Sequence, residues 1–134
     1  MTPFPTCLLV DEDPATLVPV ERALGVEGID VLGVAGTGVE ALLLLDRCPV
    51  KVIVVPFELA DLGGAAFAWR AAELARSKTR VVFSTKSTDS RLVCAALDAG
   101  AHGVVLDDKL PSSFLPAITE AAAGRLYVDP RLRR

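Results

Sequence analysis

The sequence has few of the residues that build metal, disulfide or redox sites. Among its 134 residues are one histidine and three cysteines, which lie far apart and form no C-x-x-C pair. An odd number of scattered cysteines argues against both a zinc site and a disulfide framework. We therefore expect no metal, and we interpret Cys7, Cys48 and Cys94 as small buried hydrophobic residues. Aromatic residues make up only 5% of the chain, so the predicted core is aliphatic.

Long apolar runs and excess positive charge are also missing. The apolar run at 41–45 is far shorter than the roughly 20 residues that a membrane span requires. The first residues lack the basic and apolar regions of a secretion signal, so we expect a cytoplasmic location and no membrane contact. With a net charge of −3 and a pI near 5.1, this segment is not expected to bind nucleic acid itself. Its one basic cluster, at 131–134, is interpreted as part of a tail or linker.

What the sequence does contain is an alternation of short apolar runs with helical patterns. This alternation is typical of βαβ units, in which helices cover both faces of a parallel sheet. The length suits a single domain. We predict five strands, at 6–10, 29–34, 51–55, 80–84 and 103–106.

Capping residues and glycines predict where the helices begin and end. The first helix is expected at 14–24, with Asp13 as its N-cap and a glycine after its end. Thr37 is the expected cap of the second helix. The third helix is expected to run from Gly63 or Gly64 to Arg76. The fourth is expected from Ser87 or Thr88 to Gly100. The fifth is expected from a cap at Ser113 to Gly124, which places Pro116 in its first turn.

Five strands and five helices in this order predict an α/β fold with a doubly wound parallel sheet of flavodoxin-like strand order 2-1-3-4-5. In such sheets, ligands bind in a crevice beyond the carboxyl ends of the strands, where the strand order reverses. The residues that follow the strands are therefore the candidate site. Three acids, Asp11, Glu12 and Asp13, follow the first strand. Pro56 follows the third strand and Thr85 follows the fourth. The fifth strand is followed by Asp107, Asp108 and Lys109.

Three segments, taken with their spacing, resemble the receiver domains of two-component response regulators. They are LLVDEDP at 8–14, GTGVEAL at 36–42 and ALDAGAHG at 96–103. The ending ITEAAAGRLYVDP at 118–130 is similar to receivers that precede a helix-turn-helix DNA-binding domain. The resemblance covers residues 7 to about 124 and implies the CheY-like version of the fold.

The resemblance implies roles for the residues at the strand ends. In receivers, two acids after the first strand help to hold Mg²⁺, and here these are Asp11 and Glu12. A hydroxyl after the fourth strand bonds the phosphoryl group, and here Thr85 matches it, although Thr85 can equally be a hydroxyl that only supports the next helix. The aspartate that accepts the phosphoryl group and the lysine that pairs with it are replaced by Pro56 and Asp107.

These departures imply a degenerate phosphorylation site. Proline has no nucleophilic oxygen, and a carboxylate at position 107 repels a phosphoryl dianion. Val104 also stands where receivers usually carry an aromatic switch residue. Because the converging acids raise one another's pKa, we expect Lys86 or Lys109 to supply a substitute cation, in preference to a bound divalent ion. No cofactor is expected.

Several motifs have a less specific interpretation. The pattern Gly36-x-Gly38-x-x-Ala41 matches a dinucleotide fingerprint, but it follows the second strand instead of the first, so we interpret it as a tight turn. Glu58 and Asp61 are interpreted as solvated loop charges rather than replacement phosphoacceptors. Structural roles are also expected for two residues that occur once each, His102 and Trp69.

The resulting prediction is a phosphorylation-independent regulatory module that is not an enzyme. It consists of a receiver-like domain at 1–124 and a tail or linker at 125–134 that leads to a possible DNA-binding domain. We expect a homodimer that acts in transcriptional control. The expected interface residues are Leu92, Val93, Leu97, Phe114, Leu115 and Ile118. The alternative is a sensor that binds a small molecule in the degenerate crevice.

Overall fold

Six parallel strands form a single sheet at the centre of the protein. The computed structural model describes residues 4–74 and 78–133. The sheet has the order β2-β1-β3-β4-β5-β6, so the predicted order 2-1-3-4-5 is confirmed and a short sixth strand is added. The strands are β1 (Thr6–Val10), β2 (Asp30–Ala35), β3 (Val52–Pro56), β4 (Arg80–Thr85), β5 (Gly103–Leu106) and β6 (Tyr127–Val128).

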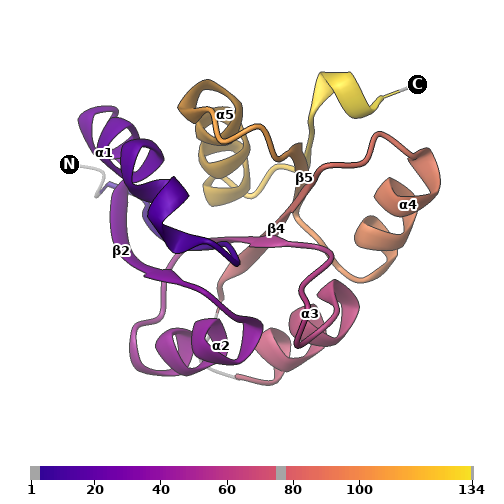
Figure 1. Ribbon diagram of the computed structural model, residues 1–134, viewed down its shortest axis with the longest axis horizontal. Coiled ribbons are helices and arrows are strands. Elements are labelled where there is room, and N and C mark those ends of the chain that lie inside the picture. Colours follow the sequence, from indigo (N-terminus) through magenta and orange to yellow (C-terminus); the bar gives the residue numbers. More distant parts are fainter. Residues whose placement is uncertain (1–3, 75–77, 134) are drawn as a thin grey trace.

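The helices cover both faces of this sheet (Figure 1). Helices α1 (Val18–Val26) and α5 (Pro111–Ala122) pack against each other on one face. Helices α2 (Gly38–Arg47), α3 (Gly64–Glu73) and α4 (Ser90–Asp98) cover the other. Two 3₁₀ turns, η1 (Pro14–Leu17) and η2 (Pro130–Leu132), precede α1 and follow β6. No helix within the described ranges has the length and apolarity needed to cross a bilayer.

Burial on both faces explains why the strands are so apolar. In β3, Val52, Ile53, Val54 and Val55 are each at most 2% exposed. Alternate residues enter two separate clusters, since Ile53 packs with α2 and α3 residues and Val54 packs with α1 and α5 residues. Burial of such side chains from water is the main stabilising contribution in a fold of this kind.

The first three helices lie close to where the sequence predicts them. The predicted helix at 14–24 is divided into η1 and α1, and Asp13 precedes it without a side-chain capping bond. The predicted cap at Thr37 is confirmed, because its Oγ1 accepts a hydrogen bond from Glu40 N. Helix α3 begins at Gly64, while the predicted end at Arg76 lies outside the described residues.

The predicted starts of α4 and α5 are wrong. Helix α4 is capped by Asp89, whose carboxylate accepts a hydrogen bond from Arg91 N, and not by Ser87 or Thr88. Helix α5 begins at Pro111 instead of after Ser113, so Pro116 lies inside the helix. Its predicted stop at Gly124 agrees with the positive φ of 85° there.

The loop between β3 and α3 is closed by a contact that only glycine permits. Gly64 N donates a hydrogen bond to Phe57 O at 2.8 Å. A Cβ at position 64 would lie 2.4 Å from Phe57 Cδ1, so a larger residue does not fit. Phe57 packs edge-on against Phe83, with ring centroids 4.9 Å apart. These contacts fix the chain immediately after Pro56, at the border of the candidate site.

Candidate functional site

The predicted crevice is present at the carboxyl ends of four strands. Its volume is about 220 Å³. All five residues predicted to form the degenerate site (Asp11, Glu12, Pro56, Thr85 and Asp107) line it, together with Glu58, Ser84 and Lys86. Parallel strands bring the residues that follow them to one edge of the sheet, which explains why residues almost a hundred positions apart meet here. Ser84 is a lining residue that the sequence analysis missed, because it lies inside β4 and not after it.

Asp11 is a buried acid held by its own backbone and by a lysine. Its main-chain N donates to Ala35 O at 3.0 Å, and its Oδ1 accepts from Asp13 N at 2.8 Å. Its Oδ2 forms an ion pair with Nζ of Lys109. The residue is only 8% exposed, so this pair is partly shielded from water.

Lys109 has an unusual backbone conformation and pairs with two acids that line the crevice. Its φ is +57°, and it is the one non-glycine residue with a positive φ in the stretches that the structure describes. Its ammonium group pairs with Asp11 and also lies 3.4 Å from Oδ2 of Asp107. Burial lowers the pKa of Lys109, but the two carboxylates favour its charged form. One cation therefore offsets the charge of two acids that follow different strands.

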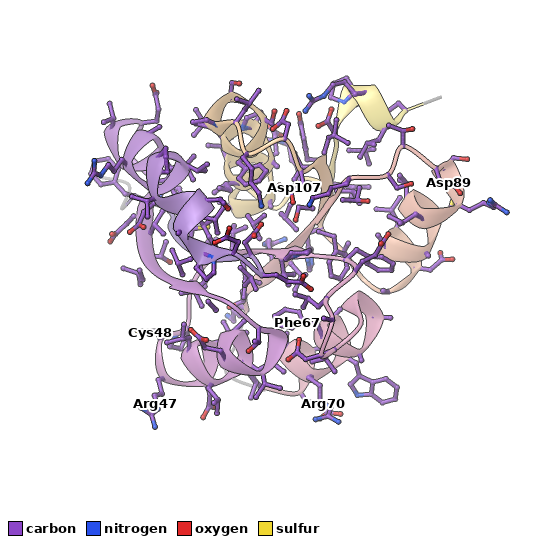
Figure 2. All side chains as sticks on the ribbon, viewed as in Figure 1. Arg47, Cys48, Phe67, Arg70, Asp89 and Asp107 are labelled. Carbon is purple, nitrogen blue, oxygen red and sulfur yellow. The ribbon has the colours of Figure 1, made fainter. Side chains whose placement is uncertain are left out.

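Asp107 lies beside the end of β5, near the centre of the molecule (Figure 2). Its side chain is 6% exposed, and its main-chain N donates to Thr85 O at 2.7 Å. Burial raises the pKa of Asp107, the charge of Lys86 opposes that shift, and Asp108 adds to it. Among the described residues, Oδ1 of Asp107 has no hydrogen-bond partner. A buried carboxylate oxygen without a hydrogen-bond partner is costly.

The other predicted acids have different partners. Oε1 of Glu12 accepts a hydrogen bond from Ala60 N at 3.0 Å, so Glu12 holds the loop after β3. Glu58 lines the crevice and is exposed. Asp61 points away to the N-terminus of α2, where it accepts hydrogen bonds from Gly38 N at 3.0 Å and Val39 N at 3.1 Å. Those two bonds lower the pKa of Asp61.

The bonds made by Asp61 also bear on the glycine-rich segment at 36–41. The backbone N–H groups that a nucleotide phosphate would use at a helix N-terminus already bond to the carboxylate of Asp61. Asp61 is thus a capping residue rather than a freely solvated charge. No local pattern in the sequence signals this role, because Asp61 is more than twenty residues from the start of the helix that it caps.

Pro56 and Thr85 complete the floor of the crevice. Pro56 is the last residue of β3 and pairs in register with Ser84 of β4. It brings neither an oxygen nucleophile nor an N–H group to that position. Thr85 is buried, and its Oγ1 accepts a hydrogen bond from Ser87 N at 3.0 Å, which stabilises the turn before α4. Residues 4–74 and 78–133 contain no group of three or more His, Cys, Asp or Glu residues arranged to hold a metal ion.

Outside the crevice, the single histidine and tryptophan have contrasting environments. His102 Nδ1 accepts a hydrogen bond from Val81 N at 3.2 Å, which joins the loop before β5 to β4. Trp69, for which partial packing is expected, is 70% exposed on α3, so most of its side chain is not packed. Cys7 is buried, whereas Cys48 and Cys94 are exposed, contrary to the interpretation that all three are buried. In Figure 2, Arg47 and Arg70 point outward from α2 and α3.

The residues expected at a dimer interface are divided between core and surface. Val93, Phe114 and Ile118 are at most 7% exposed, so they serve the core and cannot contact a partner in this conformation. The physical reason is that they occupy the faces of α4 and α5 that are turned to the sheet. The others, Leu92, Leu97 and Leu115, are partly exposed.

Comparison with known proteins identifies this arrangement. Residues 7–113 match the model of the response regulator receiver domain. The chain belongs to the response regulator receiver family. It is a signalling domain and not an enzyme.

Two curated relatives show the context in which such a receiver occurs. The transcriptional activator protein ExaE of Pseudomonas putida is 32% identical over 127 residues, which are 93% of this chain and 58% of ExaE. The nitrate/nitrite response regulator protein NarL of Escherichia coli K12 is 28% identical over 128 residues, 95% of this chain and 59% of that protein. The chain thus spans less than two thirds of the length of these relatives.

Solved structures agree on the fold. The signal receiver domain of NarL from Mycobacterium tuberculosis superposes with a TM-score of 0.82 at 26% identity, covering 92% of this chain and 100% of that domain. A two-component response regulator of the LuxR family from Aurantimonas sp. SI85-9A1 gives a TM-score of 0.86 at 24% identity, covering 96% of this chain and 91% of that one. The receiver is thus similar to the receivers of NarL-type response regulators.

Proposed function

We propose that this receiver is a phosphorylation-independent regulatory module. The observation that carries the proposal is Pro56 at the end of β3, lining the crevice where the family accepts a phosphoryl group. Without an oxygen nucleophile there, no acyl phosphate can form at that position. Asp107 adds a negative charge where the family has a lysine, which further disfavours a phosphoryl dianion.

Lys109 supports the same proposal because it provides charge compensation inside the chain. It bonds to Asp11 and lies near Asp107, whereas Lys86 lines the crevice and acts on Asp107 through its charge alone. We assign the role of substitute cation to Lys109. With its acids compensated in this way, the crevice needs neither Mg²⁺ nor a phosphoryl group to be stable.

The test is incubation with acetyl phosphate and Mg²⁺, followed by intact-mass measurement. The expected result is no mass increase. A mass increase of one phosphoryl group would overturn the proposal, and peptide mapping would show whether Glu58 has taken it up. A receiver with an intact acceptor aspartate is the positive control.

The proposed output is transcriptional control through an attached domain and dimerisation. ExaE and NarL, which are longer than this chain, carry the names of a transcriptional activator and a response regulator. We propose that residues 1–124 form the regulatory unit and that the chain beyond it connects to a DNA-binding domain. The test of dimerisation is sedimentation equilibrium, in which a monomer at every accessible concentration would contradict it. Substitution of the partly exposed Leu92, Leu97 or Leu115 by Ala is expected to weaken a dimer.

One observation favours a second candidate, a sensor of small molecules. The crevice of about 220 Å³ is lined by Asp107, whose buried Oδ1 has no hydrogen-bond partner among the described residues. A ligand with a hydrogen-bond donor would satisfy that oxygen once the Asp107 side chain turns it into the crevice. A thermal-shift screen with metabolites and nucleotides distinguishes the two candidates, since a sensor shows a concentration-dependent rise in Tm and a constitutive module shows none.

A further inference from the structure

The last described residues of the chain dock on the sheet instead of leaving it. We define the C-terminal arm as residues 125–133. Its strand β6 extends the sheet beyond β5, with Tyr127 N bonded to His102 O at 3.2 Å and Asp129 N bonded to Val104 O at 2.9 Å. Leu132 is 2% exposed and belongs to the same buried cluster as Val93 and Val104. The segment expected to be a tail or linker is therefore packed as far as Leu132.

A buried carboxylate holds the arm from within. Asp129 is 2% exposed, and its Oδ2 accepts a hydrogen bond from Leu106 N at 3.0 Å. The same carboxylate pairs with Arg131 through Nη2 at 2.7 Å and Nε at 3.0 Å. Burial raises the pKa of Asp129, but these hydrogen bonds outweigh it and leave the pKa below its ordinary value. Asp129 thus stabilises the arm as a carboxylate.

Arg131 extends this attachment to the loop that follows β5. Its Nη1 lies 2.7 Å from Oδ2 of Asp108, and its Nη2 lies 3.0 Å from Oγ of Ser113. Asp108 also accepts hydrogen bonds from Ser113 Oγ at 2.7 Å and Leu110 N at 3.0 Å. The arm is therefore bound to the loop at 107–110 by a network of charged hydrogen bonds, which are stronger than neutral ones.

The same short loop carries Asp107, which lines the crevice, and the lysine that pairs with Asp11. Lys109 lies between the carboxylates of Asp11 and Asp107, while Asp108 pairs with Arg131 of the arm. Lys109 has a φ of +57°, a left-handed conformation that is strained for a residue with a side chain. The ion pair of Lys109 with Asp11 helps to hold the loop in that conformation. If the pair is lost, the loop can relax, and Asp108 moves with it.

We propose that the loop at 107–110 couples the crevice to the C-terminal arm, so that the arm is docked while Lys109 pairs with Asp11 and is released when that pair breaks. This inference rests on the proposed function, since it describes how a receiver without an acceptor aspartate can still transmit a change in its crevice. A ligand or partner that takes Lys109 away from Asp11 would act through this route.

Release of the arm changes the surface next to α4. The arm forms one wall of an apolar groove of about 440 Å³ whose other wall is α4, lined by Ser90, Val93, Cys94, Leu97, Leu126, Val128, Leu132 and Arg133. Undocking removes that wall and uncovers buried side chains of β5 and α4.

Amide hydrogen exchange measured by mass spectrometry tests the coupling. Lys109→Met and Asp11→Asn each break the pair at the crevice and leave the arm's own residues intact. In both variants we expect exchange in peptides that cover 125–133 to rise by about tenfold or more, while peptides that cover β1 and β3 stay protected. Arg131→Ala should give the same rise and shows that the method detects a released arm.

One control variant keeps the result specific. Arg91→Ala breaks an exposed ion pair on α4, so it should not change exchange in the arm. Arm protection that is unchanged in Lys109→Met and Asp11→Asn, while Arg131→Ala loses it, would overturn the coupling. Equal exchange gains in Arg91→Ala would also overturn it. Phosphorylation by acetyl phosphate, measured separately by mass, is what would overturn the proposed function.

Discussion

Lys109, which follows β5, forms an ion pair with Asp11, which follows β1, although β3 and β4 lie between these two strands in the sheet. Lys109→Met leaves the buried acids Asp11 and Asp107 without their shared cation. We expect the free energy of unfolding at pH 7 to fall by about 1–3 kcal/mol, because an uncompensated partly buried charge is costly. Urea denaturation measures the change.

The matched control for that substitution is Lys86→Met. Lys86 lines the same crevice but has no ion pair among the described residues, so we expect a change within about 0.5 kcal/mol. If both variants were equally stable, the pair with Asp11 would contribute nothing, and Lys109 would not be a substitute cation.

Restoring the missing chemistry should need two substitutions. Pro56→Asp supplies an acceptor carboxylate at the end of β3, but the carboxylate of Asp107 still repels the incoming dianion. We expect the double variant Pro56→Asp, Asp107→Lys to take up a phosphoryl group from acetyl phosphate about tenfold faster than Pro56→Asp alone. The rate is measured by intact mass over time. Equal rates for the two variants would show that the charge at position 107 does not matter.

Gly64 allows the chain to close against Phe57. In Gly64→Ala the added Cβ would lie 2.4 Å from Phe57 Cδ1 and 2.8 Å from Phe57 O, so the loop or the ring must shift. We expect a loss of about 1–3 kcal/mol in the free energy of unfolding. Gly25→Ala is the control: no atom lies within 4 Å of its Cβ, and alanine in helix α1 should stabilise by about 0.5–1 kcal/mol. Chemical denaturation of both variants measures whether the two changes in the free energy of unfolding have opposite signs.

The pKa of Asp129 predicts how the arm responds to acid. A carboxyl group whose pKa is lowered by folding adds stability above its unfolded pKa of about 3.9, and that stability is lost as the pH falls through the lower folded pKa. Asp129→Asn should therefore be less stable than the unmodified protein at pH 7 by about 2–4 kcal/mol. The difference should shrink below about pH 4. Unfolding curves at several pH values measure it, and a difference independent of pH would contradict the assignment.

The sequence predicted the sheet and the crevice well because both depend on patterns that repeat along the chain. Strands β1 and β5 have the predicted limits, since their apolar runs end in charged residues or turns. The crevice residues followed from the strand ends and the family resemblance. Ser84 was missed because its place in the crevice depends on which side of β4 faces it, and an almost fully buried strand has no polar alternation to show that.

The starts of the helices were harder to predict than the strands, because several neighbouring residues are of types that can cap a helix. Before α4, the sequence offers four residues of types that can cap a helix: Ser87, Thr88, Asp89 and Ser90. Asp89 does so because its carboxylate also pairs with the side chain of Arg91, at 3.0 Å. Long-range packing decides the start of α5: Pro116 lies in its interior and loses one backbone bond, while Phe114 and Ile118 gain a place in the core.

Neither the strand β6 nor the role of Asp129 could be predicted from the neighbouring residues in the sequence. A two-residue strand has no periodicity, and Asp129 is an ordinary loop residue until Leu106 N and Arg131 lie beside it. The same holds for Asp61, whose partners at the start of α2 are more than twenty residues away. Such contacts depend on the tertiary structure alone.

Both edge strands of the sheet have features that disfavour pairing with a strand of another chain. At one border, β2 pairs with β1 through a register shift between Cys7 and Leu8, which makes the outer strand irregular. At the other, β6 occupies the open side of β5 with only two residues and is followed by Pro130, which has no N–H to offer. Docking of the arm therefore also protects the protein from aggregation, and any state with the arm released is open to edge-to-edge association.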